Sequence, residues 1–437
     1  MPTPTLYTAE LNTALRAVHL ASRLTKAHLL SFSSTQSRVT ESTKSDASEV
    51  TVADFAAQAV IIGIVHAAFP DDEFIAEESG EMMRGDEALA GRVWELVQGA
   101  GGLVEGEQVK GLPGSLEEMV EIIDLGQRGG SGKERQGKGR TWILDPIDGT
   151  KTYIRGQQYA VCLCLVDEGE QKVGVLGCPN LNVDEVGQDG RVVIEETVVD
   201  LEPEGGWILS ALKGSGTHVS RMRTPEDRMP IEKFLASKRA TLEQQDAINA
   251  TSNGMSQSHT DTSDPEITLR FTDSSASPHI SKDIHNRIFE HFIEPASPAS
   301  RKFSVPAVED GYPSLALDCW SMQLKYVILA FRAADAMIRT PPTSEYHAAV
   351  WDHAGGQLLL TESGGSLTDA NGVPFVVDGQ TRKLESNWGV CGVRGGSFVR
   401  RDGRQADAED THKMVLEQVR AEVGARRKGR LDSGEVD

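Results

Sequence analysis

Residues 141–150 read TWILDPIDGT, where an apolar run ends in two aspartates three positions apart. The run predicts a strand, and Pro146 is expected to force the chain out of the sheet there. The turn then brings the carboxylates of Asp145 and Asp148, with the backbone carbonyl of Ile147, towards one point. Hard oxygen ligands of this kind are those that Mg²⁺ selects. The alternative is that the two aspartates only cap a turn, as Asp–Pro and Asp–Gly sequences often do.

Gly149 and Thr150 open the segment that follows the two aspartates. If that segment is helical, its free N–H groups present the positive end of the helix dipole to a phosphate. We therefore interpret both residues as candidates for contact with a phosphate group.

Three other segments carry acids that can join the same cluster. Glu77 and Glu78 follow the apolar strand of FIAEES, and Asp352 precedes a glycine pair at the start of a helix in WDHAGG. Asp54 lies on an apolar helix in TVADFAAQ, where a buried acid needs a partner or a function. Each alone is weak evidence, because a Glu–Glu pair is often a solvated edge and an Asp before His is often an N-cap.

The composition limits the classes of partner. The 437-residue chain is 39% hydrophobic and contains no apolar run of the length of a membrane span or a signal peptide. Five cysteines without a CxxC pair favour a reducing compartment, so we expect a cytoplasmic protein. A formal charge of -21 disfavours polymeric nucleic acid and acidic membranes. A small anionic substrate then requires bound cations, or local Lys and Arg, at one site.

Hydrophobic periodicity predicts two α/β regions. The N-terminal α+β domain, residues 1–220, carries the candidate metal site and a Gly-rich segment, 98–140, expected to bury little and to form a mobile insertion. A polar connection over 221–264 leads to a C-terminal α/β domain over 265–437. Strands are expected at 73–78, 141–148, 159–166, 171–178, 191–199 and 206–212, and helices at 50–69, 281–293 and 322–338.

The AEES, WILDPIDGT and WDHAGG segments, taken in order, resemble the metal-binding motifs of the inositol monophosphatase superfamily, with TVADFAAQ as their upstream companion. The resemblance implies a layered αβαβα sandwich. It implies two or three catalytic Mg²⁺ ions and an attacking water polarised by Asp54 and Thr150. The metal ligands implied are Glu77, Asp145, Ile147 through its carbonyl, Asp148 and Asp352.

The chemistry expected of such a site is direct in-line hydrolysis of a phosphate ester by water. A bound metal lowers the pKa of water and neutralises the charge that develops on phosphoryl oxygens, so no covalent nucleophile is needed. His353 is an alternative general acid for the leaving group, but a structural histidine in the first turn of a helix is the simpler interpretation.

Two longer segments, KSDASEVTVADFAAQ and DGTKTYIRGQQYAVCL, resemble the 3′(2′),5′-bisphosphate nucleotidase branch of the superfamily. The implied substrate is 3′-phosphoadenosine 5′-phosphate (PAP), with its 5′-phosphosulfate as a further candidate. PAP would give AMP and phosphate, a reaction of sulfur assimilation, and the family resemblance implies sensitivity to Li⁺.

The phosphate that is not cleaved needs cationic partners in so acidic a protein. Lys325 and Arg339 are fourteen residues apart, which on one helix is roughly four turns, so both are expected to reach one face of a pocket. Both match positions where the nucleotidase branch holds the 5′-phosphate. The alternative is that they are ordinary surface cations near helix ends.

Two departures from the nucleotidase pattern affect the substrate contacts. The usual serine three residues before the lysine falls on Met322, with Ser321 adjacent, and the usual histidine near the base falls on Ala276, with His279 close by. The predicted substrate contacts are Gly149, Thr150, Lys325, Arg339, Ser321 and His279.

Two other functions remain open at this point. One is an inositol phosphate 1-phosphatase or monophosphatase that uses the same metals. The other is a non-catalytic nucleotide or metal sensor, against which the presence of every metal-ligand position argues. We expect a monomer whose partner is a small nucleotide bisphosphate.

Overall fold

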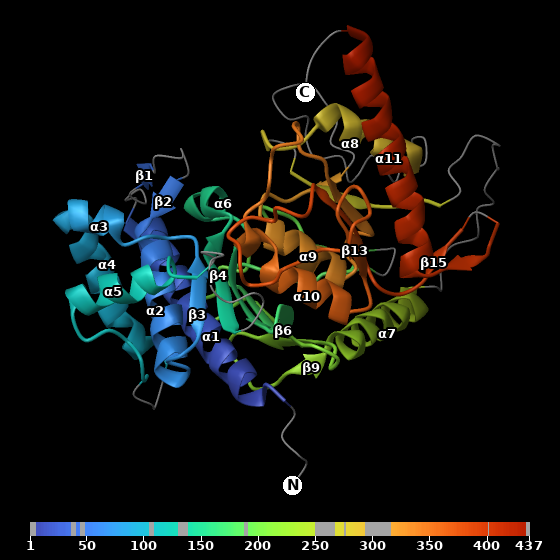
Figure 1. Ribbon diagram of the computed structural model, residues 1–437. Coiled ribbons are helices and arrows are strands. Elements are labelled where there is room, and N and C mark those ends of the chain that lie inside the picture. The colour runs from blue at the N-terminus through green and yellow to red at the C-terminus, as the bar shows by residue number, and fades with distance from the viewer. Residues whose placement is uncertain are drawn as a thin grey trace.

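The computed structural model describes residues 6–35, 41–43, 49–104, 109–129, 139–187, 191–249, 267–274, 277–292, 316–400 and 402–433. Its helices and sheets alternate in five layers, which confirms the expected αβαβα sandwich (Figure 1). Over the described residues, every helix is too short or too polar to cross a bilayer.

The first layer consists of helices packed on a seven-stranded sheet. Helix α1 (Thr8–Thr35) and helix α2 (Val52–Ala68) share one apolar core with this sheet. Helix α2 is buried from Val52 to Val65, because the sheet covers one side of it and α4 (Glu87–Ala100) and α5 (Leu116–Leu125) cover another.

The seven-stranded sheet follows the order of the chain. Its first two strands are parallel, and each later strand pairs antiparallel with the one before it, as short loops permit. The strands are β3 (Glu73–Ala76), β4 (Arg140–Asp148), β5 (Ala160–Asp167), β6 (Glu170–Cys178), β7 (Trp207–Leu212), β8 (Thr217–Arg221) and β9 (Met229–Pro230).

The middle layer is the helix pair α9 (Met322–Ala330) and α10 (Ala354–Glu362), which lies between the two sheets. Its core joins side chains of β5, β6 and β7 to Met337 and Val390 of the second sheet. Helix α9 is buried along its whole length and α10 is buried from Ala354 to Leu360, as expected of helices covered on both faces.

The second sheet has the order β11-β10-β12-β14-β13, and α8 (Lys282–Phe292) and α11 (Ala408–Ser433) cover its outer face. Helix α7 (Ile231–Asn249) follows β9 and inserts Ile231, Phe234 and Leu235 into the middle core. The strands are β10 (Phe271–Asp273), β11 (Ala316–Asp318), β12 (Ala336–Arg339), β13 (Ser366–Thr368) and β14 (Val390–Val393).

Three local expectations are wrong. The segment 98–140 was expected to bury little, yet α5 lies within it and contributes Met119 and Ile123 to the first core. The segment 191–199 was expected to be a strand, but it forms only isolated bridges, such as Val186 with Val192. The helix expected over 322–338 ends at Ala330, and the chain continues into β12.

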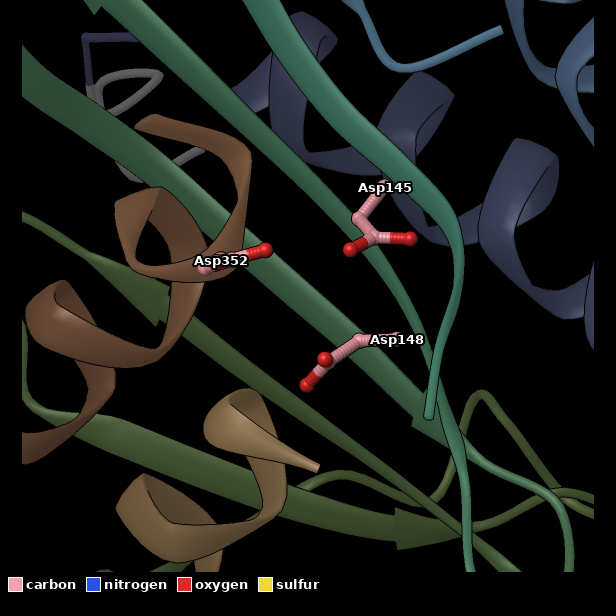
Figure 2. Close-up of side chains that lie close together, drawn as sticks. All are labelled: Asp145, Asp148 and Asp352. Carbon is pink, nitrogen blue, oxygen red and sulfur yellow. The ribbon is translucent and has the colours of Figure 1, made fainter. Parts of the chain in front are cut away.

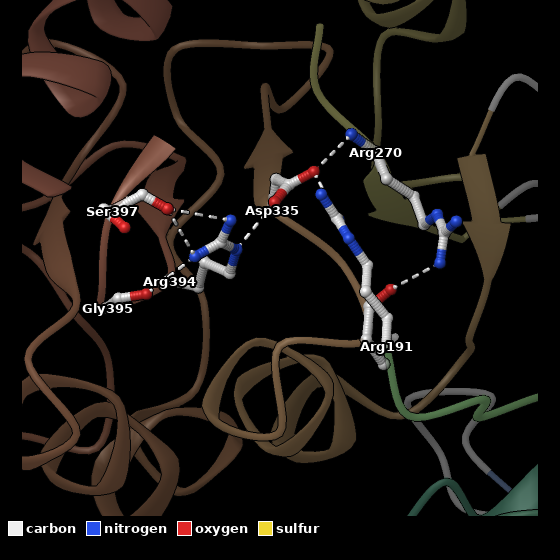
Figure 3. A network of polar contacts seen from close by, with 7 residues as sticks. Arg191, Arg270, Asp335, Arg394, Gly395 and Ser397 are labelled. Atoms are coloured by element: carbon white, nitrogen blue, oxygen red, sulfur yellow. Dashed lines mark hydrogen bonds and ion pairs between the residues drawn. The ribbon is translucent and has the colours of Figure 1, made fainter. Parts of the chain in front are cut away.

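Asp335 explains why the chain leaves the helix after Ala330. Figure 3 shows its buried carboxylate between two guanidinium groups, with Arg191 at 2.7 Å and Arg394 at 2.6 Å. The backbone N–H of Arg270 donates to it at 2.9 Å. Because Arg191 comes from the loop between β6 and β7, this contact ties that loop to the second sheet.

Candidate active site

A bulge in β4 turns both motif aspartates to the same face of the sheet. Asp145 pairs with Cys162 and Asp148 with Ala160, so β4 advances three residues where β5 advances two. Residues three apart on a regular strand point to opposite faces, and one extra residue reverses that parity. Pro146 lies in the bulge, where a strand tolerates its missing N–H. The strand therefore continues to Asp148, and the expectation that Pro146 ends it is wrong.

Asp145, Asp148 and Asp352 form an acidic cluster (Figure 2). One carboxylate oxygen of each lies within 4.8 Å of those of the other two. Asp352 comes from the short helix η3 (Val350–Asp352), which precedes α10 and faces β4. Burial, then Glu77 and Asp148, raises the pKa of Asp145 well above its ordinary value. Burial, then Asp148, raises the pKa of Asp352 to about 7.

The donor set of this cluster fits a hard divalent cation. Carboxylates that are buried this close together repel one another unless a cation lies between them or a proton binds. Among the described residues, Asp145, Asp148 and Asp352 therefore form a group that could hold a metal ion, and Glu77 lies close enough for its charge to raise the pKa of Asp145.

Glu77 reaches the cluster through the parallel pairing of β3 and β4. Ala76 is in register with Leu144, so the next residue of each strand, Glu77 and Asp145, emerges at the same edge of the sheet. Gln127 holds the backbone on both sides of Glu77, because its amide donates to the carbonyls of Ala76 at 3.2 Å and Glu78 at 2.6 Å.

Glu78 itself is buried, and the side chain of Gln58 holds its backbone. Its N–H donates to Oε1 of Gln58 at 3.0 Å, and its carbonyl accepts from Nε2 of the same amide at 2.8 Å. Gln58 also donates to the carbonyl of Ile123 in α5 at 3.1 Å. The segment 98–140 thus supports the acidic site, which its composition did not indicate.

Arg382 joins the Glu77 segment to the Asp352 segment. Its guanidinium donates to the carbonyls of Ala76 at 2.5 Å and Gly126 at 3.0 Å. The same group lies 4.9 Å from the ring centroid of Trp351, the residue before Asp352. Sequence reasoning did not identify Arg382, and its position in a polar loop gives no local signal of this role.

Asp54 and Thr150 lie beside the cluster. Asp54 is buried in the first turn of α2, and its charge contributes to the raised pKa of Asp145. The hydroxyl of Thr150 donates to the carbonyl of Ile147 at 3.2 Å, so both groups lie at the end of β4. Gly149, with φ of 97°, starts the short helix α6 (Thr150–Ile154), and this left-handed conformation favours glycine.

Ser321 and Gln323 hold Asp148 from the start of α9. The Ser321 hydroxyl and the Gln323 backbone N–H both donate to Oδ2 of Asp148 at 2.5 Å. The Gln323 side chain donates to the carbonyl of Trp351 at 2.6 Å and accepts from the N–H of Gly356 at 2.7 Å. Gln323 therefore fixes the Asp148 and Asp352 segments relative to each other, a role that sequence reasoning missed.

A cavity of about 360 Å³ opens beside the acidic cluster. Glu77, Gly149 and Thr150 line one part of it, and Lys325 and Arg339 line another. Two predicted cations therefore meet at one cavity, although not through a shared helix as expected, because Arg339 ends β12. The rest of the lining includes Lys151, Asp273, Ser274, His279, Ile280, Trp320, Met322, Met337 and Val390.

The two cations differ in how they are held. Lys325 is buried, and its ammonium donates to the Ser274 hydroxyl at 2.6 Å and to the Ser321 carbonyl at 3.4 Å. Arg339 donates through Nη2 to the Tyr346 hydroxyl at 2.9 Å, while its buried Nε has no hydrogen-bond partner in the described part of the chain. Each side chain keeps N–H groups that can donate to an anion.

Three histidines near the site differ in their surroundings, and His279 is the one of the three that belongs to the cavity lining. His279 is an exposed residue of the cavity lining whose ring stacks on Tyr346, with centroids 5.0 Å apart. His353 is fully buried, and its Nδ1 lies 2.8 Å from the Tyr326 hydroxyl. Burial lowers the pKa of His353 well below its ordinary value, which favours the structural interpretation of this residue. Nε2 of His285 accepts from the N–H of Thr340 at 3.0 Å, so its Nδ1 donates to Asp273 at 2.8 Å.

Ser321 is the predicted contact that the structure places elsewhere. It is fully buried. Its hydroxyl caps α9 by accepting a hydrogen bond from the N–H of Leu324, and it donates a hydrogen bond to Asp148. It is therefore absent from the described lining of the cavity, which instead contains the adjacent residues Trp320 and Met322.

Comparison with known proteins places this site in a family. The family model described as the inositol monophosphatase family matches residues 10–394. The chain belongs to the inositol monophosphatase family. Members are metal-dependent, and the acidic cluster is a group within the described part of the chain that could hold a metal ion.

Its similar relatives include several from fungi and plants. The chain is 35% identical to a 3′(2′),5′-bisphosphate nucleotidase of Emericella nidulans over 79% of its own length and 84% of the relative. It is 34% identical to 3′(2′),5′-bisphosphate nucleotidase 2 of Candida albicans, over 90% and 95%. A 3′(2′),5′-bisphosphate nucleotidase of Oryza sativa is 31% identical, over 84% and 85%.

Proposed function

We propose that this chain is a metal-dependent 3′(2′),5′-bisphosphate nucleotidase, which hydrolyses the 3′-phosphate of PAP to give AMP and phosphate. The observation that carries the proposal is the cavity. Its lining includes Glu77 and Thr150, which lie beside the acidic cluster, and also the two cations Lys325 and Arg339. A substrate with two phosphates can place one at each part. The names of the fungal and plant relatives support the same activity.

Glu77, Asp145, the Ile147 carbonyl, Asp148 and Asp352 would hold two or three Mg²⁺ ions. Bound Mg²⁺ supplies a water of lowered pKa and neutralises charge on the phosphoryl oxygens. Gln323 and Ser321 keep Asp148 oriented through its Oδ2, which leaves the other carboxylate oxygen available to a cation.

Asp54 and Thr150 orient the attacking water in this proposal. Asp54 supplies a buried acceptor near Asp145, and Thr150 supplies a hydroxyl that can donate and accept at once. The Thr150 hydroxyl already bonds to the Ile147 carbonyl, so its direction is fixed before a substrate enters. The water oxygen forms a bond to phosphorus as the bond between phosphorus and the 3′-oxygen breaks, and the 3′-oxygen gains a proton in place of the one that the water loses, which gives AMP and phosphate.

Lys325 and Arg339 hold the 5′-phosphate. The Lys325 ammonium donates to Ser274 and Ser321, so one of its three N–H groups remains for the phosphate. The Arg339 Nε is buried without a partner among the described residues, and a phosphate oxygen would satisfy it. Local cations of this kind reverse the field that a formal charge of -21 creates around the protein.

The remaining lining favours a nucleoside over an inositol ring. Ile280, Met322, Met337 and Val390 give the cavity an apolar part. An inositol ring, with a hydroxyl on every carbon that does not carry the phosphate, would lose hydrogen bonds to water there, whereas the two faces of a flat base carry no hydrogen-bonding groups. An inositol phosphate phosphatase remains the second candidate at the level of the family alone.

Phosphate release from PAP, 3′-AMP and inositol 1-phosphate, measured with Mg²⁺ and with added Li⁺, tests the proposal. We expect PAP to be the best substrate and Li⁺ to inhibit. Lys325→Met should lower the preference for PAP over 3′-AMP by about tenfold or more, because one charge-assisted contact is lost. Lys172→Met, a control on the far end of β6 where the lysine pairs with Glu170, should keep the preference. Faster turnover of the inositol ester would replace the proposal with the second candidate.

A further inference from the structure

Trp320 is a cavity residue that none of the preceding chemistry uses. It lies between β11 and α9, is partly buried, and borders the cavity together with Met322. The next residue, Ser321, donates to Asp148 at 2.5 Å. Trp320 therefore directly precedes a residue that contacts the acidic cluster, at the end of the cluster where helix α9 begins.

The indole ring of Trp320 is held in place from two directions. The guanidinium of Arg155, which follows α6, lies 4.8 Å from the ring centroid and covers one face. The indole Nε1 donates to Oδ2 of Asp318 at 3.3 Å, which fixes the edge of the ring. A ring restrained in this way loses little conformational freedom when a flat partner packs on its other face.

We propose that the face of Trp320 opposite Arg155 is the platform on which the nucleobase of the substrate stacks, an inference that rests on the proposed function. In a nucleoside 3′-phosphate the base and the 3′-ester are carried by one ribose ring, on carbons separated by a single carbon. A 3′-ester at Asp148 therefore places the base close to the residue that precedes Ser321. Arg155 strengthens the stack from behind, because a cation on one face of an aromatic ring is compatible with a base on the other.

His279 is the other aromatic ring of the lining, and its surroundings assign it to the phosphate side. Its ring stacks on Tyr346, whose hydroxyl accepts from Arg339. Partial burial, then Arg339 and Lys151, lowers the pKa of His279, so cations surround it. Cations gather where a phosphate binds, whereas the cation that lies against the ring of Trp320 among the described residues is Arg155, and the indole N–H contacts the carboxylate of Asp318.

The test compares PAP with ribose 3,5-bisphosphate, which carries both phosphates and no base. In Trp320→Ala, the ratio of kcat/KM for PAP to that for ribose 3,5-bisphosphate should fall by about tenfold, since stacking on an aromatic side chain contributes on this scale. Trp320→Phe retains an aromatic face and should keep most of the ratio. His279→Ala should change the two substrates together.

Two results would overturn the inference. One is an equal loss on both substrates in Trp320→Ala, which would make Trp320 a structural residue. The other is a loss of the ratio in His279→Ala without one in Trp320→Ala, which would move the base to the histidine. Failure of the wild-type protein to hydrolyse PAP would instead contradict the proposed function, so the two failures are separate.

A binding measurement without turnover gives a second readout. Titration with AMP should quench part of the tryptophan fluorescence of the wild-type protein, and this part should be lost in Trp320→Phe. Undiminished quenching in Trp320→Phe would contradict the platform, because another tryptophan would then report the base.

Discussion

Replacing Asp148 by Asn tests the acidic cluster because it removes one charge and changes almost no volume. We expect phosphate release from PAP to fall on the order of 10³-fold or more, because a charged group that positions the reaction is lost. The fold should survive, since the amide oxygen of Asn can still accept from Ser321 and from the backbone of Gln323. The same substitution has a second consequence, for stability without metal.

Without a cation, Asp148 repels Asp145 and Asp352. Two unit charges 4.8 Å apart repel by about 3 kcal/mol at an effective dielectric constant of 20. Partial protonation of Asp145 and Asp352, whose pKa values are raised, reduces the repulsion energy. The gain from removing the charge of Asp148 is also offset in part, because each of the two hydrogen bonds to residue 148 weakens by about 1 kcal/mol when its acceptor is neutral. The balance is a stabilisation of about 1–3 kcal/mol, or a rise in Tm of about 1–3 °C for a chain of this length.

The assay is thermal unfolding of wild type and Asp148→Asn in EDTA and in Mg²⁺, alongside phosphate release. The variant should melt at a higher temperature in EDTA, and Mg²⁺ should raise its Tm less than it raises that of the wild type. Near-normal turnover in a folded variant would refute the ligand role of Asp148. A lower Tm in EDTA would refute the claim that the metal-free cluster is strained by repulsion.

Three further predictions concern other parts of the molecule. Asp335→Asn should lower stability, whereas Asp148→Asn should raise it in the absence of metal. It leaves the buried Arg394 without its charged partner, so the free energy of unfolding measured in urea should fall by about 3–5 kcal/mol. A gain in stability would contradict the network in Figure 3. Gln323→Leu leaves the Trp351 carbonyl and the Gly356 N–H unpaired, so the free energy of unfolding should fall by about 1–3 kcal/mol for each group. The Mg²⁺ concentration for half-maximal activity should rise. An unchanged Mg²⁺ titration would contradict the positioning role of Gln323. The pKa of Asp352 is raised to about 7, so the stability that its protonated form contributes without metal is present at low pH and is lost as the pH rises through 7. The Mg²⁺ concentration required for activity should fall from pH 6 to pH 8. Melting curves in EDTA check the first prediction, and Mg²⁺ titrations at both pH values check the second.

The sequence predicted the strands that carry AEES and WILDPIDGT, because each of these two motifs sits at the end of an apolar run. Parallel strands in register bring Glu77 and Asp145 to one edge of the sheet, because Ala76 pairs with Leu144. The geometry behind the Asp145 and Asp148 pair was not predictable from their spacing alone. It depends on pairing with β5, which a single strand does not encode.

The helix expected over 322–338 shows how tertiary contacts override a local pattern. The segment LAFRAADAMI contains no glycine or proline, so nothing in it marks an end. The chain turns at Arg332, with φ of 59°, and the two guanidinium groups on Asp335 hold it there. Both partners, Arg191 and Arg394, are distant in the sequence, which is why periodicity alone gave the wrong element.

Helix α5 was missed for a different reason, because a local signal for it exists. Ser115 accepts from the N–H of Glu118, and the Glu118 carboxylate accepts from the N–H of Gly114, close to a capping box. The glycines and charges on both sides of this signal dominated the composition of 98–140. The contacts of Gln323 and Arg382 left no comparable signal, because each joins segments that meet only in the folded chain.

The extra residue in β4 has a consequence for attempts to move this chemistry into another scaffold. If β5 advanced three residues over this stretch, as β4 does, Asp148 would point to the α2 side of the sheet, opposite to Asp145 and away from Asp352. The sequence DPID therefore places both carboxylates on one face of the sheet only when the paired strand has one residue fewer over the same stretch. A designer who grafts the motif must transplant the mismatch between two strands along with the acids.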